Sequence, residues 1–270
     1  MNPAVTFDIF GLEASLGSYG LFMMLAAIIV FALSIYGIYK AGLPFRSSLL
    51  CLILMAVSLP VGARALNVAI NFGYYMDNPH RILALDTIGF SLMGGLVLSG
   101  LVGVVLSRIM GLDQWRLGDS VAPGLGLGLA VMRMGCFMNG CCFGLESDVP
   151  WAVRFPFDSP AHRHYISLTS GNSSLFAMFR SPSVHPTQVY EIIGSLIAAL
   201  VAYLMIRKGA KPGVPVASAA IVFTTARLIN HFLRVHPSTN QVPFLFYPTV
   251  YLLIIVYLVF LLLRRIRSEN

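Results

Sequence analysis

Charged side chains are scarce in this 270-residue sequence. Only 11% of the residues are Asp, Glu, Lys or Arg, against about a quarter in soluble domains, and 57% are hydrophobic. This deficit excludes an ordinary soluble domain and indicates an integral membrane protein. The formal net charge of +7 does not indicate nucleic acid binding, because the basic residues punctuate apolar runs and form no stripe with interleaved aromatics. We expect lipid headgroups as their partners.

Cysteine is also rare, and no internal repeat is found. Four cysteines are too few for a disulfide scaffold, and no Cys-x-x-Cys motif of a disulfide oxidoreductase is present. We interpret Cys51, alone in an apolar run, as inert packing. The lack of duplicated halves weakens a transporter or channel function, although arginines on the outer side could line an anion path.

Seven segments are apolar and long enough to cross a bilayer, which takes about 20 residues. They predict an all-α, polytopic membrane protein with a single transmembrane domain over residues 1–270. The sixth is the weakest of these predictions. The segments are Gly20–Tyr39, Ser48–Ile70, Gly89–Leu106, Val121–Met138, Thr187–Ile206, Val214–Asn230 and Pro248–Leu263.

The basic residues predict an orientation. Ten of the 18, including every lysine, fall in the loops of one side. Because cytoplasmic loops are basic, we expect the N-terminus outside and the C-terminus inside. The polar segment at about 141–186 then forms an outer loop or head. Its length is typical of functional or disordered loops.

The other eight basic residues are all arginines, in outer loops or the outward halves of helices. They lie on the side where the orientation rule predicts few basic residues. Their planar guanidinium groups are suited to bind phosphate or carboxylate. We interpret them as an outward-facing anion site. They are Arg64, Arg81, Arg133, Arg154, Arg163, Arg180, Arg227 and Arg234.

The densest chemistry lies where the fourth apolar segment ends. An arginine there costs about 3 kcal/mol or more unless it is interfacial, paired or faces a polar cavity. Together with an amide side chain and close backbone N–H groups it could bind a phosphodiester headgroup. The alternative is an arginine that snorkels to the interface beside glycines that allow helix packing. The set is Arg133, Gly135, Asn139, Gly140 and Gly144.

Two further candidates lie on the fifth and sixth segments. Arg227, His231 and Arg234 are spaced i, i+4 and i+7, which predicts one helix face able to bind phosphate and move a proton. The alternative is an interfacial Arg234 and a His231 bonded to a carbonyl. Glu191 is an acid on an apolar helix that begins near Pro186, and we expect it to pair with an arginine. Structural pairing and a catalytic role both stay open.

Three cysteines, Cys136, Cys141 and Cys142, lie close together in the sequence. A disulfide or a thiol pair is one interpretation, and a zinc site of Cys136 and Cys141 with His162 and His164 is another. The His-x-His spacing is unusual for structural zinc, so we favour structural or disulfide roles and predict no bound metal.

In order along the chain, these motifs resemble the prolipoprotein diacylglyceryl transferase family. The matching motifs are Tyr19-Gly-Leu, Gly62-Ala-Arg64, Gly94-Gly95-Leu, Asp119-x-x-Ala-Pro123, Arg133-x-Gly135-x-Phe-x-Asn139-Gly140-x-x-x-Gly144, Pro150-Trp-Ala, His185-Pro-x-Gln-x-Tyr-Glu191 and Arg227-x-x-x-x-Phe-x-Arg234. The resemblance implies seven helices, an outward N-terminus and a multi-pass location in the bacterial inner membrane.

The family moves a diacylglyceryl group from phosphatidylglycerol to the thiol of a lipobox cysteine in a prolipoprotein, and releases glycerol phosphate. The resemblance implies that Arg133 and Arg227 engage the lipid phosphate, and that no cofactor is needed. Guanidinium forks in a partly dry cavity would stabilise the leaving phosphate. Tyr19, Gly94, Gly95 and the other matching residues named above are the expected substrate-binding positions.

Five positions depart from the family's pattern: Met93 replaces a histidine, Cys136 an asparagine, Cys141 a glutamate, Phe223 a tyrosine and His231 a glutamate. They suggest a divergent branch that keeps the phosphate clamp and changes the surroundings of the acceptor. One hypothesis is that His231 supplies the missing base. Another is that the acceptor is not a lipobox cysteine. A non-catalytic phospholipid-binding membrane protein is the further alternative.

Overall fold

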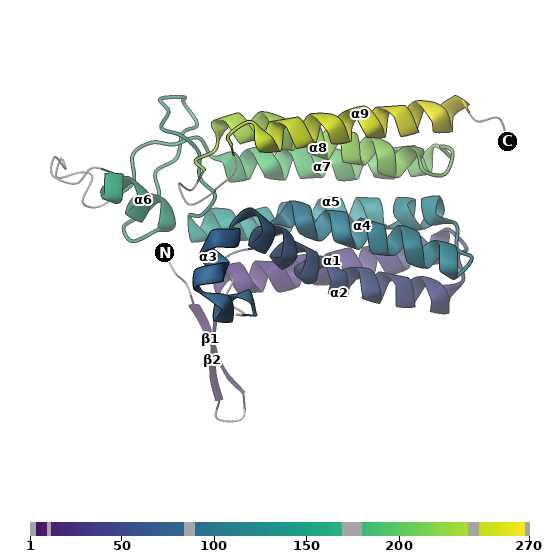
Figure 1. Cartoon of the computed structure of the whole chain (residues 1–270), viewed down its shortest axis with the longest axis horizontal. Helices are drawn as coiled ribbons and strands as arrows, with labels where there is room; N and C mark the ends of the chain where they lie inside the picture. The colour runs from purple at the N-terminus through teal and green to yellow at the C-terminus, as the bar shows by residue number, and fades with distance from the viewer. Residues whose placement is uncertain (1–3, 10–11, 84–89, 169–179, 237–242, 268–270) are drawn as a thin grey trace.

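The computed structural model describes residues 4–9, 12–83, 90–168, 180–236 and 243–267. Among these residues, seven helices are long and apolar enough to cross a membrane. Figure 1 shows them side by side along one common axis. The prediction of seven spans is confirmed. They are α1 (Ser18–Lys40), α2 (Phe45–Ile70), α4 (Leu92–Ile109), α5 (Gln114–Asn139), α7 (Thr187–Arg207), α8 (Val214–Leu233) and α9 (Phe246–Arg267).

Smaller elements lie outside these spans. Strands β1 (Ala4–Ile9) and β2 (Leu12–Gly17) form an antiparallel hairpin before α1, which the sequence analysis did not predict. Helix α3 (Phe72–Asp77) and the short helix η1 (Pro79–Ile82) follow α2. Helix α6 (Pro160–Leu168) lies within the predicted outer segment, whose described parts are therefore folded. The all-α prediction holds for every long element.

The predicted span limits differ most at α5, which begins seven residues before Val121. The Asp113 carboxylate caps this helix, because Oδ1 accepts the backbone N–H groups of Trp115, at 2.9 Å, and Arg116, at 3.2 Å. Hydropathy alone misses this first polar stretch. Helices α7 and α8 begin at the predicted residues. The predicted start of the third span, Gly89, lies outside the described residues.

Helix α5 is the most buried span and positions the others. Its small residues let neighbouring backbones approach closely, as is typical of packing between membrane helices. A Cβ added at Gly126 would lie 2.8 Å from the Ala199 Cβ of α7, and one added at Gly128 would lie 2.2 Å from a methyl group of Val30 on α1. Helix α5 therefore lies between α1 and α7.

The two ends of the bundle differ in which helix termini lie there. At one end α5 and α8 finish while α1, α7 and α9 begin, and α6 lies beside them (Figure 1). At the other end α5 begins beside the start of α8, where the Asp119 carboxylate accepts N–H groups of Gly213, at 2.8 Å, and Val216, at 2.9 Å. The candidate site lies at the first end.

Candidate functional site

Glu191 is the centre of a buried ion cluster. It lies in the second turn of α7, and only 5% of its side chain is exposed. Arg133 of α5 contacts Glu191 Oε2 through Nε. Arg227 of α8 places Nη1 2.5 Å from Oε1, and Arg234, the residue after α8, places Nη1 4.0 Å from the same oxygen. The predicted pairing of Glu191 with an arginine is confirmed, and it involves three arginines.

Neutral donors and acceptors complete this cluster. Asn230 donates from Nδ2 to Glu191 Oε1, at 3.0 Å, and to the Thr187 carbonyl, at 3.2 Å. Arg227 donates from Nη2 to the hydroxyl of Tyr251 on α9, at 3.4 Å. Side chains from α5, α7, α8 and α9 therefore meet around one carboxylate, and each guanidinium is held in a defined position.

The cluster carries an excess of positive charge. Three guanidinium groups face one carboxylate, so these four side chains sum to +2. The exposed side-chain fraction rises from 8% for Arg133 through 15% for Arg227 to 26% for Arg234, so the cluster opens toward Arg234. Buried charges of one sign are costly without a counter-charge, and guanidinium forks match phosphate oxygens. This arrangement is suited to bind an anion.

The other predicted members of the anion site lie elsewhere. Arg64 donates to the Tyr75 hydroxyl, at 3.3 Å, and its guanidinium lies 4.3 Å from the centre of the Phe90 ring. Arg154 donates to Ser183, at 2.9 Å. The prediction of one site made from eight arginines is therefore wrong, because Arg64 and Arg154 bond elsewhere. Three of the eight, namely Arg133, Arg227 and Arg234, converge on Glu191.

Gly140 and Gly144 shape the chain after α5. Gly140 ends the helix in the left-handed region, with a φ of 69°. At Gly144 an added Cβ would lie 2.6 Å from the His185 carbonyl oxygen and 2.7 Å from that of Leu233. Gly144 also forms an antiparallel bridge to Arg234. This close approach joins the start of α7 to the end of α8 and so positions Arg234.

Three further predicted site residues lie near Arg133 or the cysteines beside it, namely Tyr19, Gly135 and Asn139. A Cβ at Gly135 would lie 2.7 Å from the Phe22 Cβ, so this glycine lets α1 pack on α5. The Tyr19 hydroxyl then interacts electrostatically with Arg133 and the neighbouring cysteines. Asn139, the last residue of α5, interacts through its side chain with Cys141. The structure thus brings Tyr19 to the predicted site and gives Asn139 a thiol neighbour.

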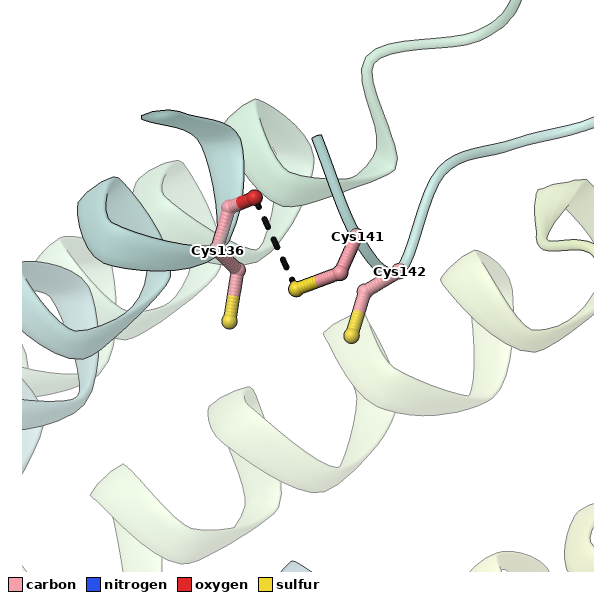
Figure 2. A group of neighbouring side chains, drawn as sticks. All are labelled: Cys136, Cys141 and Cys142. Atoms are coloured by element: carbon pink, nitrogen blue, oxygen red, sulfur yellow. Dashed lines mark hydrogen bonds between the residues drawn. The ribbon is translucent and has the colours of Figure 1, made fainter. Parts of the chain in front are cut away.

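Cys136, Cys141 and Cys142 lie beside Arg133. Arg133 Nη1 is 3.6 Å from the Cys136 sulfur and 3.8 Å from the Cys142 sulfur. All three cysteines are free thiols in this structure (Figure 2), so the predicted disulfide is not formed. Hydrogen bonds from Cys136 and Cys141 hold the pKa of the Cys142 thiol well below its ordinary value, against the opposing effect of burial.

The structure does not form the alternative zinc set of two cysteines and two histidines. His162 accepts the Asp158 backbone N–H through Nδ1, at 3.1 Å. His164 packs on the ring of Phe143, with centroids 5.4 Å apart. Both histidines lie in α6, whose packing turns them toward partners in the outer segment. The third sulfur atom close to those of Cys136 and Cys141 belongs to Cys142.

The predicted shared face of Arg227, His231 and Arg234 is also wrong. Helix α8 ends one residue before Arg234, which is extended, with φ −99° and ψ 143°. The His231 Nε2 bonds the Phe244 carbonyl, at 3.1 Å, and its ring lies 4.2 Å from that of His236. Burial lowers the pKa of His236, whose ring donates to the His231 carbonyl. The alternative of a carbonyl-bonded His231 is therefore the one that the structure shows.

Gly94 and Gly95 serve helix packing where the sequence suggested substrate binding. A Cβ added at Gly94 would lie 2.4 Å from the Gly62 carbonyl oxygen, and one at Gly95 would lie 2.8 Å from that of Leu59. Both contacts press α4 against α2. The neighbours of both glycines are residues of α2 and not of the Glu191 cluster.

The sequence analysis missed Asn230 and Tyr251 as members of this cluster. Asn230 lies three residues after Arg227, so the i, i+3 spacing on one helix face was a usable signal. Tyr251 contacts Arg227 only because α9 packs on α8, and no local pattern marks it. Thr187 and Gln188, which hold the cysteine backbone from α7, were likewise not singled out.

Known proteins identify the family of this chain. The family model described as prolipoprotein diacylglyceryl transferase matches residues 4–264. Similar curated relatives are phosphatidylglycerol–prolipoprotein diacylglyceryl transferases of Brucella anthropi, Brucella ovis and Brucella canis, each 31% identical over 168 residues. The match covers 61% of this chain and 52% of each relative, so the chain spans about half the length of the curated relatives it matches. With seven membrane helices and a model match over nearly its whole length, the chain belongs to the prolipoprotein diacylglyceryl transferase family.

Proposed function

We propose that this protein transfers a diacylglyceryl group from phosphatidylglycerol to the thiol of a cysteine in a prolipoprotein or a related acceptor. The observation that supports this most directly is the convergence of Arg133, Arg227 and Arg234 on Glu191 with an excess of two positive charges. The relatives' names describe the same transfer. The seven apolar helices are consistent with a donor that is a membrane lipid.

Arg133 and Arg227 bind the lipid phosphate in this proposal, and Arg234 stands at the more exposed side as a further phosphate ligand. The acceptor cysteine reacts as its thiolate, after its proton has passed to water. During transfer the thiolate sulfur forms a bond to the glycerol carbon while the carbon–oxygen bond to phosphate breaks. Glycerol phosphate leaves with the electron pair. Fixed guanidinium groups stabilise the charge that develops on this leaving group, and this step uses no cofactor.

Glu191, Asn230 and Tyr251 act as positioning residues. The Glu191 carboxylate balances part of the positive charge before the lipid enters, and it orients both guanidinium forks. Tyr19 lies beside Arg133 and would line the same cavity. Gly144 acts by holding Arg234 in place. His231 does not transfer a proton in this proposal, because its Nε2 is bonded to a backbone carbonyl.

The proposed orientation places this end of the bundle at the outer face of the bacterial inner membrane, with the N-terminus outside. The loops at the opposite end contain every lysine of the chain. Basic loops stay on the cytoplasmic side. In this orientation the Glu191 cluster faces the compartment in which secreted precursors with a lipobox cysteine emerge.

The proposal is tested with the purified full chain, phosphatidylglycerol vesicles and a lipobox peptide. Mass spectrometry should show the peptide gaining a diacylglyceryl mass, whereas a peptide with serine in place of cysteine should gain none. We expect Arg133→Gln and Arg227→Gln to lower the rate about 100-fold or more. The matched control is Arg163→Gln, because Arg163 is an exposed arginine near the same end that pairs with Asp158.

Two results would contradict the proposed transfer. If the wild-type chain binds phosphatidylglycerol but forms no peptide product under any condition, the protein is a lipid-binding member without activity. If Arg133→Gln and Arg227→Gln retain the rate of Arg163→Gln, the phosphate is not bound at the Glu191 cluster. A product on other thiols, with none on the lipobox peptide, would instead identify a different acceptor.

A further inference from the structure

The three cysteines beside Arg133 form a group that the proposed transfer does not use. Cys136 lies in the last turn of α5, and Cys141 and Cys142 follow the end of this helix. Their sulfur atoms all lie within 4.8 Å of one another. Figure 2 shows the three side chains bordering one common space, with the Cys141 thiol 3.7 Å from the Cys136 carbonyl. Three thiols from two turns of chain thus converge on a single point.

The spacing of the sulfur atoms is close to that of a metal site. Metal–sulfur bonds of about 2.3 Å place three ligands of one ion about 4 Å apart. The observed separations need to contract by less than about 1 Å to reach this value. In the described part of the chain, no histidine or carboxylate joins this group, so the ligand set consists of sulfur alone.

The backbone that presents these sulfurs is held by buried side chains of α7. Thr187 donates to the Cys142 carbonyl, at 2.6 Å, and Gln188 donates to the Cys141 carbonyl, at 2.7 Å. Both side chains are buried, with 1% exposure. Cys142 itself has a φ of 62°, a conformation that a residue with a side chain rarely adopts. A strained backbone conformation fixed by buried hydrogen bonds is typical of a functional site.

A positive charge lies beside the group, and the form of cysteine that binds a metal is the negatively charged thiolate. Arg133 Nη1 lies within hydrogen-bond distance of the sulfurs of Cys136, at 3.6 Å, and Cys142, at 3.8 Å. Three thiolates around a divalent ion carry a net charge of −1, which a neighbouring guanidinium would balance. Cys136 is buried while Cys141 and Cys142 are half-buried, so an ion can enter from one side.

We propose that Cys136, Cys141 and Cys142 form a three-thiolate binding site for a soft, thiophilic metal ion such as Zn²⁺ or Cu⁺. Soft sulfur ligands select these ions over Mg²⁺ and Ca²⁺. A structural zinc site normally has four protein ligands, whereas three leave one position open. The bound ion would thus keep a coordination position on the exposed side of the cluster. This site does not depend on the proposed transfer.

The test uses the purified full chain in detergent, reduced with a phosphine and freed of metal by a chelator. Cd²⁺ serves as the probe, because its bonds to thiolate absorb in the ultraviolet. We expect absorption that saturates at one ion per chain and is reversed by a competing chelator. The same sample titrated with Mg²⁺ should show no binding. Cd²⁺ should also replace Zn²⁺ in a chain loaded with Zn²⁺, because the softer ion binds sulfur ligands more tightly.

The four cysteines supply matched variants. Cys136→Ser and Cys142→Ser should each weaken Cd²⁺ binding at least tenfold, whereas Cys51→Ser should bind like the wild type, because Cys51 lies against the Gly103 carbonyl in another helix pair. Thermal unfolding of each variant verifies folding, and Cys141→Ser provides a third probe of the same site. The proposal is overturned if reduced wild type shows no saturable absorption, or if Cys142→Ser binds as tightly as Cys51→Ser. It is also overturned if freshly isolated, alkylated protein contains a disulfide within the triad.

Discussion

The two ends of the bundle each contain a buried carboxylate, but its partners differ. Asp119, on α5, accepts two backbone N–H groups at the start of α8. Glu191, on α7, contacts guanidinium groups of Arg133 and Arg227. Backbone N–H groups are fixed parts of a helix terminus and carry only partial charge, so the two groups bonded to Asp119 add no full positive charge. The Glu191 end keeps an excess of positive charge.

Asp119 holds two helices together, whereas the Glu191 cluster can also bind a ligand. Asp119 joins α5 to α8, and Gly213 allows this contact because an added Cβ would lie 2.6 Å from the Trp115 ring. Glu191 also joins α5 to α8, but through side chains that can exchange one oxygen partner for another. A phosphate can therefore take over some of the contacts that the Glu191 carboxylate makes with guanidinium groups. No such exchange is possible for the backbone N–H groups bonded to Asp119.

The largest effect is expected for Glu191→Gln, which leaves three arginines without their counter-charge. Removing one partner of a buried ion pair costs about 3–5 kcal/mol. The free energy of unfolding in detergent, measured by denaturant titration, should fall by that amount. A loss under about 1 kcal/mol would show that the guanidinium groups are already neutralised by solvent or lipid.

Arg227→Lys tests whether the Glu191 end needs the fork as well as the charge. Lysine keeps one positive charge but cannot make the two-pronged contact to Glu191 and Tyr251. The transfer rate should fall about 100-fold. It is measured as diacylglyceryl peptide formed per minute, with Arg163→Lys as the control. A rate equal to that control would mean that charge alone suffices.

Asp119→Asn should have a smaller effect, confined to stability. The amide oxygen still accepts one N–H group, while the second contact and the charge are lost. Hydrogen bonds to charged groups contribute about 1.5–3 kcal/mol, so unfolding should become easier by about 2 kcal/mol. The transfer rate per folded molecule should match the wild type. A rate loss as large as that of Arg227→Lys would remove the distinction between the two ends.

The smallest effect is expected for Arg116→Gln, at the same end as Asp119. Arg116 pairs with Asp113 at 3.6 Å, but their side chains are 56% and 42% exposed. Exposed pairs contribute about 0–1 kcal/mol, so the unfolding free energy should change by about 0.5 kcal/mol or less. A larger change, measured by the same denaturant titration, would indicate that Arg116 supports the cap at Asp113.

Arginine in an apolar run was the most informative pattern in the sequence. Arg133 and Arg227 were predicted to act together, and both converge on Glu191. Arg234 also reaches Glu191, but not from the predicted helix face, because the helix ends before position 234. Pairing with Gly144 ends that helix, and no local property of the sequence marks this long-range contact. His231 consequently turns to the Phe244 carbonyl instead of the phosphate site.

The cysteines show a second limit of prediction from the sequence. Their spacing suggested a pair with two downstream histidines, but α6 turns those histidines toward Asp158 and Phe143. The contact that assembles the triad comes from Thr187 and Gln188, about 45 residues away in the chain. Spacing along the sequence identifies neighbours within a turn of helix, and it says little about which side chains a distant helix brings to them.

The sequence by itself determined the seven spans, because a bilayer requires about 20 apolar residues for each crossing. It also determined that the buried arginines need an anion, because a lone charge at that depth is costly. Only the tertiary structure decided that Arg133, Arg227 and Arg234 share Glu191, and that three thiols lie beside them. Those contacts depend on how closely α5, α7 and α8 pack, which is set by side-chain shapes across the bundle.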